Sequence, residues 1–205
     1  MDTKKNHWEN IYQSKPANQV SWFQPHLAKS LESIASTRID KEARIIDVGG
    51  GASALVDDLM EKGFKNITVV DISSEALKVS KGRLGDRAGN VQWIEGNVTQ
   101  VSLTPNYYDL WHDRAVFHFL VSPEDRRKYI ESLTKSLKFK GYLLMATFGP
   151  NGPLKCSGLE IVRYSSGSLQ KELGDAFHLE KEAIEIHKTP FDTAQEFLYC
   201  LFQKI

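Results

Sequence analysis

Asp47, Asp71 and Asn97 each stand at or just after the end of an apolar stretch of the sequence. If these stretches are neighbouring parallel strands, the three polar side chains meet in the crevice beyond the strands' carboxyl ends. A carboxylate at position 71 can accept hydrogen bonds from both hydroxyls of a ribose, and the amide oxygen at position 97 can accept from an adenine amino group. Taken singly, the same residues could form an Asx-turn, a helix cap and a turn. Together they indicate a nucleoside-binding site.

Three consecutive glycines, Gly49, Gly50 and Gly51, separate Asp47 from Ser53. Glycines at a strand-to-helix junction permit a tight turn and let the backbone approach a ligand with no Cβ in the way. Ser53 is placed to cap the helix that follows. A glycine cluster alone also occurs in ordinary turns, so the interpretation depends on the flanking acids.

The charge beside the glycines discriminates between nucleotide ligands. Gly49, Gly51 and Ala54 satisfy the loose dinucleotide pattern, which makes a nicotinamide dehydrogenase the main competing class. The carboxylate of Asp47 would repel a pyrophosphate, whereas it would attract the ammonium of the amino-acid tail of S-adenosylmethionine. The sequence also lacks the Tyr-x-x-x-Lys pair of short-chain dehydrogenases and the Gly-Lys-Ser/Thr of a P-loop. The glycine turn therefore favours S-adenosylmethionine.

Alternating strands and helices must position these residues. Apolar runs and turn residues predict five buried strands and a C-terminal hairpin: 43–48, 67–71, 91–94, 107–111, 141–148, 177–188 and 195–204. Helices are expected before Pro16, from about Pro25, after Ser53, from Ser73 or Ser74 to about Gly82, from Pro123 to about Lys138, and from Ser165 or Ser166. Repeated strand–helix units followed by a hairpin predict an α/β fold, a mostly parallel sheet between two helix layers with an antiparallel edge.

Composition limits the class of protein further. A chain of 205 residues fits one domain. With 26 basic and 26 acidic residues the net charge is zero, so we expect no nucleic-acid partner, since phosphate binding usually brings a basic excess. No apolar stretch reaches membrane-spanning length, and Cys156 and Cys200 have no pairing or metal-ligand spacing. We therefore expect a cytoplasmic protein without a membrane partner or a metal.

From about residue 40 to 205 the sequence resembles the class I S-adenosylmethionine-dependent methyltransferases. The resemblance is carried by the loop 47–53, by Asp71, by Gly96-Asn97-Val98 and by the segment 109–118. It implies a Rossmann-like seven-stranded sheet of order 3-2-1-4-5-7-6 with strand 7 antiparallel, and S-adenosylmethionine as cofactor, released as S-adenosylhomocysteine. Asp71 would bind the ribose, and the loop would hold the methionine part. The expected cofactor-binding residues are Asp47, Gly49, Gly50, Gly51, Ser53, Asp71, Ile72, Asn97, Val98 and Asp113. Asn97 departs from the family, where an aspartate is common.

The segment after the fourth predicted strand would lie beside the transferred methyl group. His118 could deprotonate the acceptor and Asp113 could hold an amine or hydroxyl of it. The alternative for His118 is a histidine packed between Phe117 and Phe119. Arg114 could bind an acidic acceptor, or could form an ion pair with Asp113 or Glu124. Because methyl transfer from a sulfonium depends mainly on alignment and exclusion of water, acid–base residues are optional.

Aromatic residues gather in the first 23 positions, among them Trp8, Tyr12 and Trp22. In the family the N-terminal segment often covers the cofactor, so we expect residues 1–38 to form such a helical cover over a methyltransferase domain at 39–205. Aromatic faces can stabilise a cation, although plain packing is the commoner role. Cys156 lies in a loop placed to line the acceptor pocket.

These observations predict methyl transfer to a small-molecule acceptor. The first alternative is a protein-lysine methyltransferase, because Asp113 and the following basic residue faintly resemble the Asp-Lys-Gly-Thr segment of elongation-factor lysine methyltransferases. The second alternative is a non-catalytic S-adenosylmethionine-binding module, suggested only by Asn97. The sequence leaves the reacting atom and the oligomeric state open.

Overall fold

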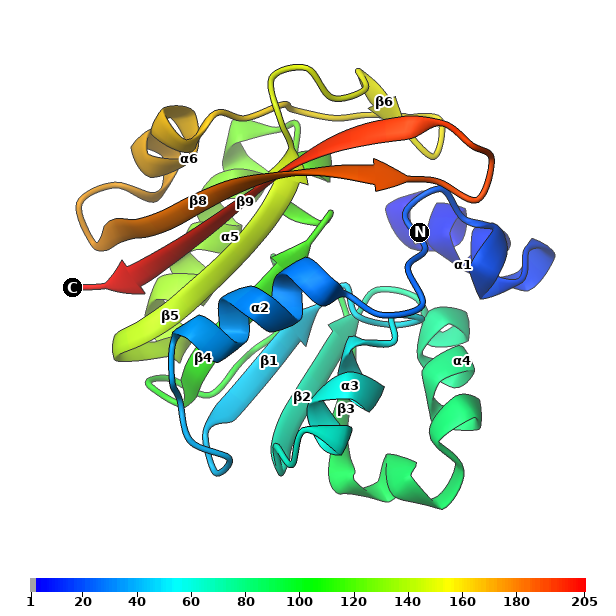
Figure 1. The fold of residues 1–205 in the computed structure, drawn as a ribbon, viewed down its shortest axis with the longest axis horizontal. Coiled ribbons are helices and arrows are strands. Elements are labelled where there is room, and N and C mark those ends of the chain that lie inside the picture. Colours follow the sequence, from blue (N-terminus) through cyan, green and yellow to red (C-terminus); the bar gives the residue numbers. More distant parts are fainter. Residues whose placement is uncertain (1–2) are drawn as a thin grey trace.

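A computed structural model describes residues 3–205 of the chain. In this part, the main sheet contains seven strands: β1 (Arg44–Val48), β2 (Asn66–Asp71), β3 (Val91–Glu95), β4 (Tyr108–Arg114), β5 (Leu137–Phe148), β8 (Phe177–Lys188) and β9 (Ala194–Lys204). Their order across the sheet is β3-β2-β1-β4-β5-β9-β8 (Figure 1). Strands β1 to β5 are parallel, and β9 runs antiparallel to β5 and to β8.

This arrangement confirms the expected α/β fold and its strand order. The labels β8 and β9 correspond to strands 6 and 7 of the prediction, because β6 (Lys155–Cys156) and β7 (Leu159–Glu160) form a separate two-stranded ribbon that was not predicted. The order reverses between β1 and β4, which pair in parallel with Asp47 opposite His112. A ligand crevice is expected beyond the carboxyl ends of strands at such a reversal.

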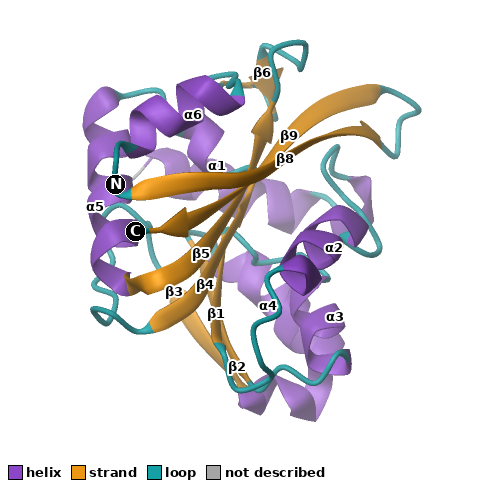
Figure 2. Cartoon of the chain, turned by 60° about the vertical axis from the view of Figure 1, so that its left-hand side comes forward, coloured by secondary structure: helices purple, strands orange, loops and turns teal. Residues whose placement is uncertain are grey.

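Helices cover both faces of the sheet (Figure 2). Within residues 3–205 they are α1 (Thr3–Ser14), α2 (Ala28–Ser36), α3 (Leu55–Glu61), α4 (Ser74–Leu84), α5 (Pro123–Ser136) and α6 (Ser166–Leu173), with short 3-10 helices η1 (Ala17–Gln19), η2 (Gly85–Asn90) and η3 (Phe117–Phe119). None of these helices is long and apolar enough to cross a membrane.

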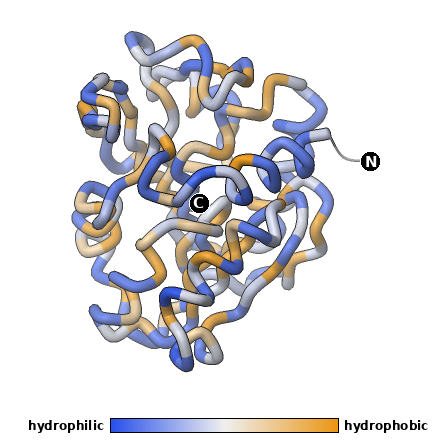
Figure 3. The backbone as a smooth tube through the Cα atoms, turned by 90° about the vertical axis from the view of Figure 1, so that its right-hand side faces the viewer, coloured by the Kyte–Doolittle hydropathy of each residue, from blue (hydrophilic) through white to orange (hydrophobic). Residues whose placement is uncertain are grey.

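The sheet separates two apolar cores. On one face, Tyr129 and Leu133 of α5 and Leu169 of α6 pack against the strands. On the other, residues of α2, α3 and α4, such as Ile34 and Leu59, fill the space above the same strands. Hydrophobic and hydrophilic stretches alternate along the backbone (Figure 3), as expected where each helix buries only one face. Burial of the central strands on both faces accounts for their nearly continuous apolar runs.

Element boundaries differ from the prediction mainly around the site. Strand β4 continues to Arg114, three residues beyond its expected end, so that position 113 lies on the strand and not in a following turn. Strand β5 begins directly after α5, at Leu137. Ser73 caps α4 as predicted, accepting from Ala76 N. Ser53 accepts from Leu55 N at 3.1 Å but stands one residue before the N-cap of α3.

Candidate active site

A cavity opens at the carboxyl edge of β1, β2 and β4, next to the order reversal. The space between its lining residues is about 880 Å³, open solvent at the mouth included. Its lining comes from all three strand ends, from η3 and from α1, and consists of Lys4, Trp8, Tyr12, Trp22, Val48, Gly49, Val70, Asp71, Ile72, Gly96, Asn97, Val98, Arg114, Ala115, Val116, Phe119, Leu120 and Cys156. Among the predicted site residues, ten therefore meet in one cavity.

A second, smaller cavity continues from the first along the glycine turn. The two share Tyr12, Trp22, Val48, Gly49 and Arg114. The second cavity adds the predicted residues Asp47, Gly50 and Ser53, together with His112, which was not predicted. The combined shape is elongated, with β2 and β3 at one end and the glycine turn at the other. Gly51, Asp113 and His118 line neither cavity.

Asp71 lies at the wall between β2 and the glycine turn. One carboxylate oxygen accepts from Gly51 N at 2.9 Å and the other from Ser73 N at 2.8 Å. Burial raises the pKa of Asp71 to about 6, although both N–H groups favour its ionised form. Two backbone bonds fix the carboxylate while its remaining lone pairs stay available to hydroxyl donors. The side chain can therefore accept further hydrogen bonds from a molecule in the cavity.

In the glycine turn, residues 49–51, the backbone packs closely against the carboxylates of Asp47 and Asp71. Gly49 has a φ of +71°, a conformation that disfavours side chains, and a Cβ there would overlap Val116. A Cβ at Gly50 would overlap the carboxylate of Asp47, and one at Gly51 would lie 2.6 Å from Oδ2 of Asp71. Gly50 and Gly51 are therefore required by close packing of the loop on the two acids, and Gly49 by its backbone conformation and its contact with Val116.

Asp47 belongs to a buried chain of hydrogen bonds. Its Oδ1 lies 2.7 Å from Nδ1 of His112, and Nε2 of the same imidazole lies 2.9 Å from Oγ of Ser30 in α2. The other oxygen, Oδ2, is buried and has no partner among the described residues. A buried carboxylate oxygen without a donor is costly. An ammonium group entering along the glycine turn would satisfy it, so this end of the site fits the amino-acid part of S-adenosylmethionine.

Asn97 lines the nucleoside end of the cavity but also stabilises its own turn. Its Oδ1 accepts from Thr99 N at 3.0 Å and from Thr99 Oγ1 at 2.8 Å. The turn suggested as the alternative role is thus present. An oxygen with two donors has little remaining capacity, so the expected bond from an adenine amine to this oxygen would compete with the turn.

Helix α1 lies against the cavity and is attached at the start of α4 (Figure 1). The carboxylate of Glu9 accepts from Ser73 Oγ, from Ser74 N and Oγ, and from Glu75 N, at 2.9 to 3.1 Å. Burial opposes ionisation, but these bonds outweigh it and lower the pKa of Glu9. An acid at a helix N-terminus satisfies free N–H groups and interacts favourably with the helix dipole. Glu9 therefore fixes α1, with Trp8 and Tyr12, over the cavity.

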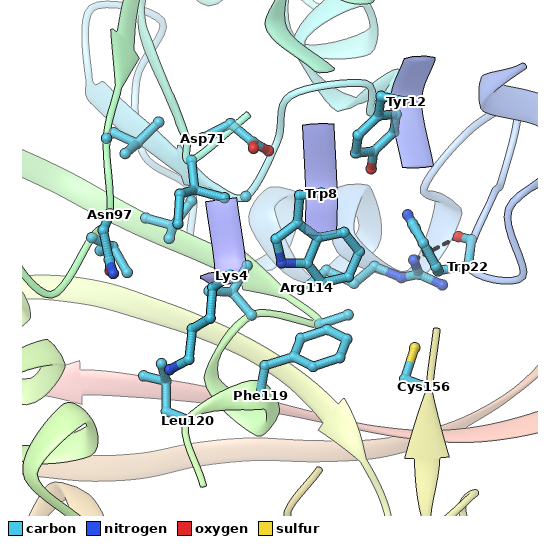
Figure 4. A pocket seen from close by; sticks show the side chains of 18 residues that line it. Lys4, Trp8, Tyr12, Trp22, Asp71, Asn97, Arg114, Phe119, Leu120 and Cys156 are labelled. Atoms are coloured by element: carbon cyan, nitrogen blue, oxygen red, sulfur yellow. Dashed lines mark hydrogen bonds between the residues drawn. The ribbon is translucent and has the colours of Figure 1, made fainter. Parts of the chain in front are cut away.

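Aromatic rings form the end of the cavity opposite Asn97. Trp8 packs edge-to-face on Trp22 and on Phe119, with ring centroids 5.6 and 5.1 Å apart (Figure 4). Arg114 and Cys156 lie on the same side. Burial raises the pKa of the Cys156 thiol to about 12, so the thiol stays protonated near neutral pH. Apart from Arg114 this end is lined mainly by apolar groups, which suits an acceptor beside a sulfonium.

Asp113 is not a site residue in this structure, contrary to prediction. Its carboxylate is fully buried and accepts from Val116 N, from Phe117 N and from the hydroxyl of Tyr129 at 2.5 Å. Because β4 extends past position 111, the side chain points to the α5 face and not into the cavity. Burial raises its pKa to about 6, with the three donors acting in the opposite direction. Its contacts hold the β4–η3 turn together.

The position of His118 likewise disagrees with the predicted role of general base. The imidazole is fully buried outside both cavities, with its ring centroid 4.5 Å from that of Phe119 and 4.7 Å from that of Phe148. Its Nδ1 accepts from Phe148 N at 3.2 Å. Burial, with a smaller contribution from Arg114, lowers its pKa to about 3. His118 is a packed histidine, although one of its two phenylalanine neighbours is Phe148 and not Phe117.

The sequence analysis missed His112 and Glu9. The signal for His112 is its register, because parallel pairing of β1 with β4 places it directly opposite Asp47. Register between strands distant in sequence cannot be read from hydrophobic pattern alone. Glu9 gives no local signal, since its partners lie 64 to 66 residues away.

Comparison with known proteins defines the class that the fold and the site indicate. Residues 46–145, which run from within β1 into β5 and include most of the cavity wall, match the family model of the methyltransferase domain. This segment is therefore similar to a methyltransferase domain, whose cofactor is S-adenosylmethionine. The buried oxygen of Asp47 and the wall formed by Asp71 fit this cofactor.

Similar proteins act on different acceptors. The chain is 22% identical over 158 residues to the human EEF1A lysine methyltransferase 2, covering 70% of this chain and 66% of that protein. It is 31% identical over 117 residues to the malonyl-[acyl-carrier protein] O-methyltransferase of Halalkalibacterium halodurans, covering 55% and 41%. The chain thus spans less than two thirds of either protein.

A solved structure shows the same fold. The 1,6-didemethyltoxoflavin-N1-methyltransferase of Burkholderia thailandensis, determined with 1,6-didemethyltoxoflavin and S-adenosylhomocysteine, superposes with a TM-score of 0.69 at 16% identity. The match covers 98% of this chain and 84% of that one. At this level of identity the similarity shows a shared fold only.

Proposed function

We propose that this protein transfers the methyl group of S-adenosylmethionine to a small-molecule acceptor. The observation that carries the proposal is the buried, unpartnered Oδ2 of Asp47 at the glycine turn. This oxygen would accept a hydrogen bond from an ammonium at one end of the elongated cavity, and Asp71 would accept from a ribose further along. A cofactor bound to both carboxylates would direct its sulfonium toward the aromatic rings of Tyr12 and Trp22, which line both cavities.

The cofactor supplies an activated methyl group on a positively charged sulfur. The acceptor's nucleophilic atom forms a bond to the methyl carbon as the carbon–sulfur bond breaks, the electron pair stays on sulfur, and the acceptor loses a proton. The protein's part is to align the two molecules and exclude water. Trp8 and Trp22 cover the reacting region, and their faces favour a cation there. Asp71 and Asp47 hold the donor at two separated points.

The described residues around the acceptor end offer no general base. His118 and Asp113 lie outside the cavities, and the Cys156 thiol is protonated. We therefore propose that the acceptor's own acidity, or solvent, accounts for proton loss. We further propose that the described residues 3–38 of the predicted segment 1–38 form the cover of the site and residues 39–205 the methyltransferase domain, whereas residues 1 and 2 lie outside the described part of the chain. The free, buried cysteines Cys156 and Cys200 favour a reducing, cytoplasmic location.

Two measurements test this function. S-adenosylhomocysteine should bind the wild-type protein in calorimetry, and Asp47→Asn should weaken that binding by about tenfold to a hundredfold, because a hydrogen bond to a charged group contributes about 1.5–3 kcal/mol. Asp57→Asn is the matched control, since this carboxylate pairs with Arg83 on the surface. NAD binding without S-adenosylhomocysteine binding would overturn the proposal. Cofactor binding with no turnover on any acceptor would favour a non-catalytic binding module.

A protein-lysine methyltransferase is the second candidate, favoured by the similarity to the human EEF1A lysine methyltransferase 2. The two functions separate when the enzyme is incubated with methyl-labelled S-adenosylmethionine and cell lysate. Label in the low-mass fraction supports the small-molecule acceptor. Label in precipitated protein, removed by lysine acetylation of the lysate, supports the second candidate.

A further inference from the structure

Arg114 brings a positive charge to the acceptor end of the cavity. It is the last residue of β4 and lines both cavities. Its Nε donates to the hydroxyl of Tyr199 and its Nη1 to the carbonyl of Trp22, each at 2.9 Å. Its guanidinium lies over the ring of Phe197, 4.4 Å from the centroid. These contacts fix the guanidinium plane from three sides.

The third nitrogen of the guanidinium is unsatisfied. Nη2 is buried and has no hydrogen-bond partner among residues 3–205. The two ion pairs suggested by the sequence are absent there, because Asp113 binds the β4–η3 turn and Glu124 pairs with Arg127 and Lys128. Glu185 reaches Arg114 only through the Tyr199 hydroxyl. A buried charged donor without an acceptor is costly, so the site calls for an anionic partner from outside the chain.

The surroundings of Arg114 narrow the chemistry of that partner. Figure 4 shows the guanidinium between Trp8 and Trp22, on the side of the cavity away from Asn97. Phe119 and Cys156 add apolar surface nearby. Lys4, the other cation in the lining, is paired with Asp125. The surroundings of Arg114 therefore combine one positive charge without an ionic partner and several aromatic rings. Such a site suits a molecule with a flat apolar body, which packs on the rings, and a single negative group, which pairs with the guanidinium.

We propose that the methyl acceptor is a small molecule with a planar apolar body and one carboxylate, and that Arg114 binds this carboxylate. The inference rests on the proposed methyltransferase function and specifies its substrate class.

Arg114 has two other possible roles, and each predicts a different result. It could bind the carboxylate of the cofactor's methionine, since it lies at the junction of the two cavities. Its replacement would then weaken S-adenosylhomocysteine binding. It could instead be a brace joining β4, Trp22 and Tyr199. Lysine, which keeps the charge but cannot reproduce the three fixed contacts, would then be as harmful as glutamine.

The test uses the whole protein and a protein-free cell extract separated by ion exchange into anionic, neutral and cationic pools. Wild type, Arg114→Gln, Arg114→Lys and Arg163→Gln each receive methyl-labelled S-adenosylmethionine and one pool. Arg163 is the matched control, because it also donates to a backbone carbonyl, that of Gly152, and lines neither cavity. The labelled product is treated with a carbodiimide and an amine to detect a carboxylate.

We expect the wild type and Arg163→Gln to label the anionic pool in a product that carries a carboxylate or its methyl ester. Arg114→Gln should lower this transfer by about 10- to 100-fold, as expected for loss of a hydrogen bond to a charged group. Arg114→Lys should retain most of it. The affinity for S-adenosylhomocysteine should change by less than about twofold in all variants.

Several outcomes would overturn the inference. Label only in the neutral or cationic pool refutes the anionic acceptor but leaves methyltransferase activity intact. Equal losses in both Arg114 variants indicate the brace, and weakened S-adenosylhomocysteine binding in Arg114→Gln indicates a cofactor contact. Label in no small-molecule pool, with S-adenosylhomocysteine bound, refutes the acceptor class. Absence of S-adenosylhomocysteine binding refutes the proposed function itself.

Discussion

Two neighbouring regions of the sheet edge carry acids at the ends of their strands, yet only one of them faces the cavity. At β1 and β2, Asp47 keeps an unpartnered buried oxygen and Asp71 lines the cavity wall. At β4, Asp113 accepts three hydrogen bonds from its own turn and from Tyr129. The two regions look alike in sequence, since in each an acid follows a largely apolar run at or near the end of a strand.

The two strand ends differ in the path of the backbone that follows each strand. After β1 the glycine turn packs closely on the carboxylate of Asp47 but leaves its Oδ2 without a hydrogen-bond donor. After β4 the chain folds back over Asp113, and the N–H groups of Val116 and Phe117 point at it. An acid at a strand end can bind a ligand only when its own loop leaves it donor-free lone pairs.

The largest effect is expected from a matched pair of substitutions. Asp71→Asn should weaken S-adenosylhomocysteine binding by at least about 100-fold, because two hydrogen bonds from ribose to a charged group contribute about 1.5–3 kcal/mol each. Asp113→Asn should leave the affinity within about threefold. Isothermal titration of both variants decides the matter. Equal losses would show that the two regions do not differ in ligand contact.

For the free energy of unfolding, Asp113→Asn should have a larger effect than Asp71→Asn. Asp113→Asn should lower the free energy of unfolding by about 1–3 kcal/mol, because an amide cannot accept all the bonds that the buried carboxylate accepts. Urea denaturation of the cofactor-free protein measures it. Asp109→Asn is a useful reference, since Asp109 is on the same strand and pairs with Lys138 near the surface. A smaller loss in Asp113→Asn than in this reference would contradict the structural role.

The raised pKa of Asp71 makes cofactor binding pH-dependent. Ribose hydroxyls bind its ionised form, so the affinity for S-adenosylhomocysteine should fall by up to about tenfold per pH unit below about 6. In the cofactor-free protein the buried acids Asp71 and Asp113 affect stability, and here a rise in pH is unfavourable. Between pH about 4 and 6 the folded state holds protons that the unfolded state has released, so the free energy of unfolding falls as pH rises.

Titrations at pH 5, 6 and 7 measure the first of these effects. Asp71→Asn should have nearly constant affinity across the range, whereas Asp113→Asn should retain the wild-type dependence. A wild-type affinity that does not change between pH 7 and 5 would contradict a role for ionised Asp71.

The smallest effect is expected at His118. Replacement by phenylalanine preserves the aromatic packing and removes only the acceptor of the Phe148 N–H bond, so the free energy of unfolding should fall by about 1 kcal/mol. Methyl transfer should remain within about twofold of wild type. A loss of turnover by more than tenfold at unchanged cofactor affinity would restore the general-base hypothesis.

The sequence predicted the elements that hydrophobic periodicity and glycine placement determine. Five parallel strands, the C-terminal hairpin and the cluster of Gly49, Asp71 and Asn97 follow from local pattern, because each strand end brings its polar residue to the same edge. The end of β4 was predicted too early because Asp113 and Arg114 are polar and were assigned to a loop. In the structure both belong to the strand: Asp113 accepts hydrogen bonds from the following turn, and Arg114 lines the cavity.

Partnerships between distant segments were beyond local pattern. The pairing of His112 with Asp47 requires the register of β4 on β1. The position of Glu9 on α4 requires knowing how α1 packs, and the helix has no buried residue from which to infer its docking. Successive side chains of a strand point to opposite faces of the sheet, so Asp113 and Arg114 face different sides. A shift of the predicted strand by one residue would exchange which of the two faces the cavity.

The attachment of α1 has a kinetic consequence. No residue of the helix is fully buried, and its links to the rest of the chain include the Glu9 contacts and the ion pairs of Lys4 with Asp125 and Lys5 with Glu95. Exposed charge pairs are screened by salt, whereas apolar packing is not. The residence time of S-adenosylhomocysteine beneath the helix should therefore shorten as ionic strength rises, and substrate exchange would depend on ion pairs at the protein surface.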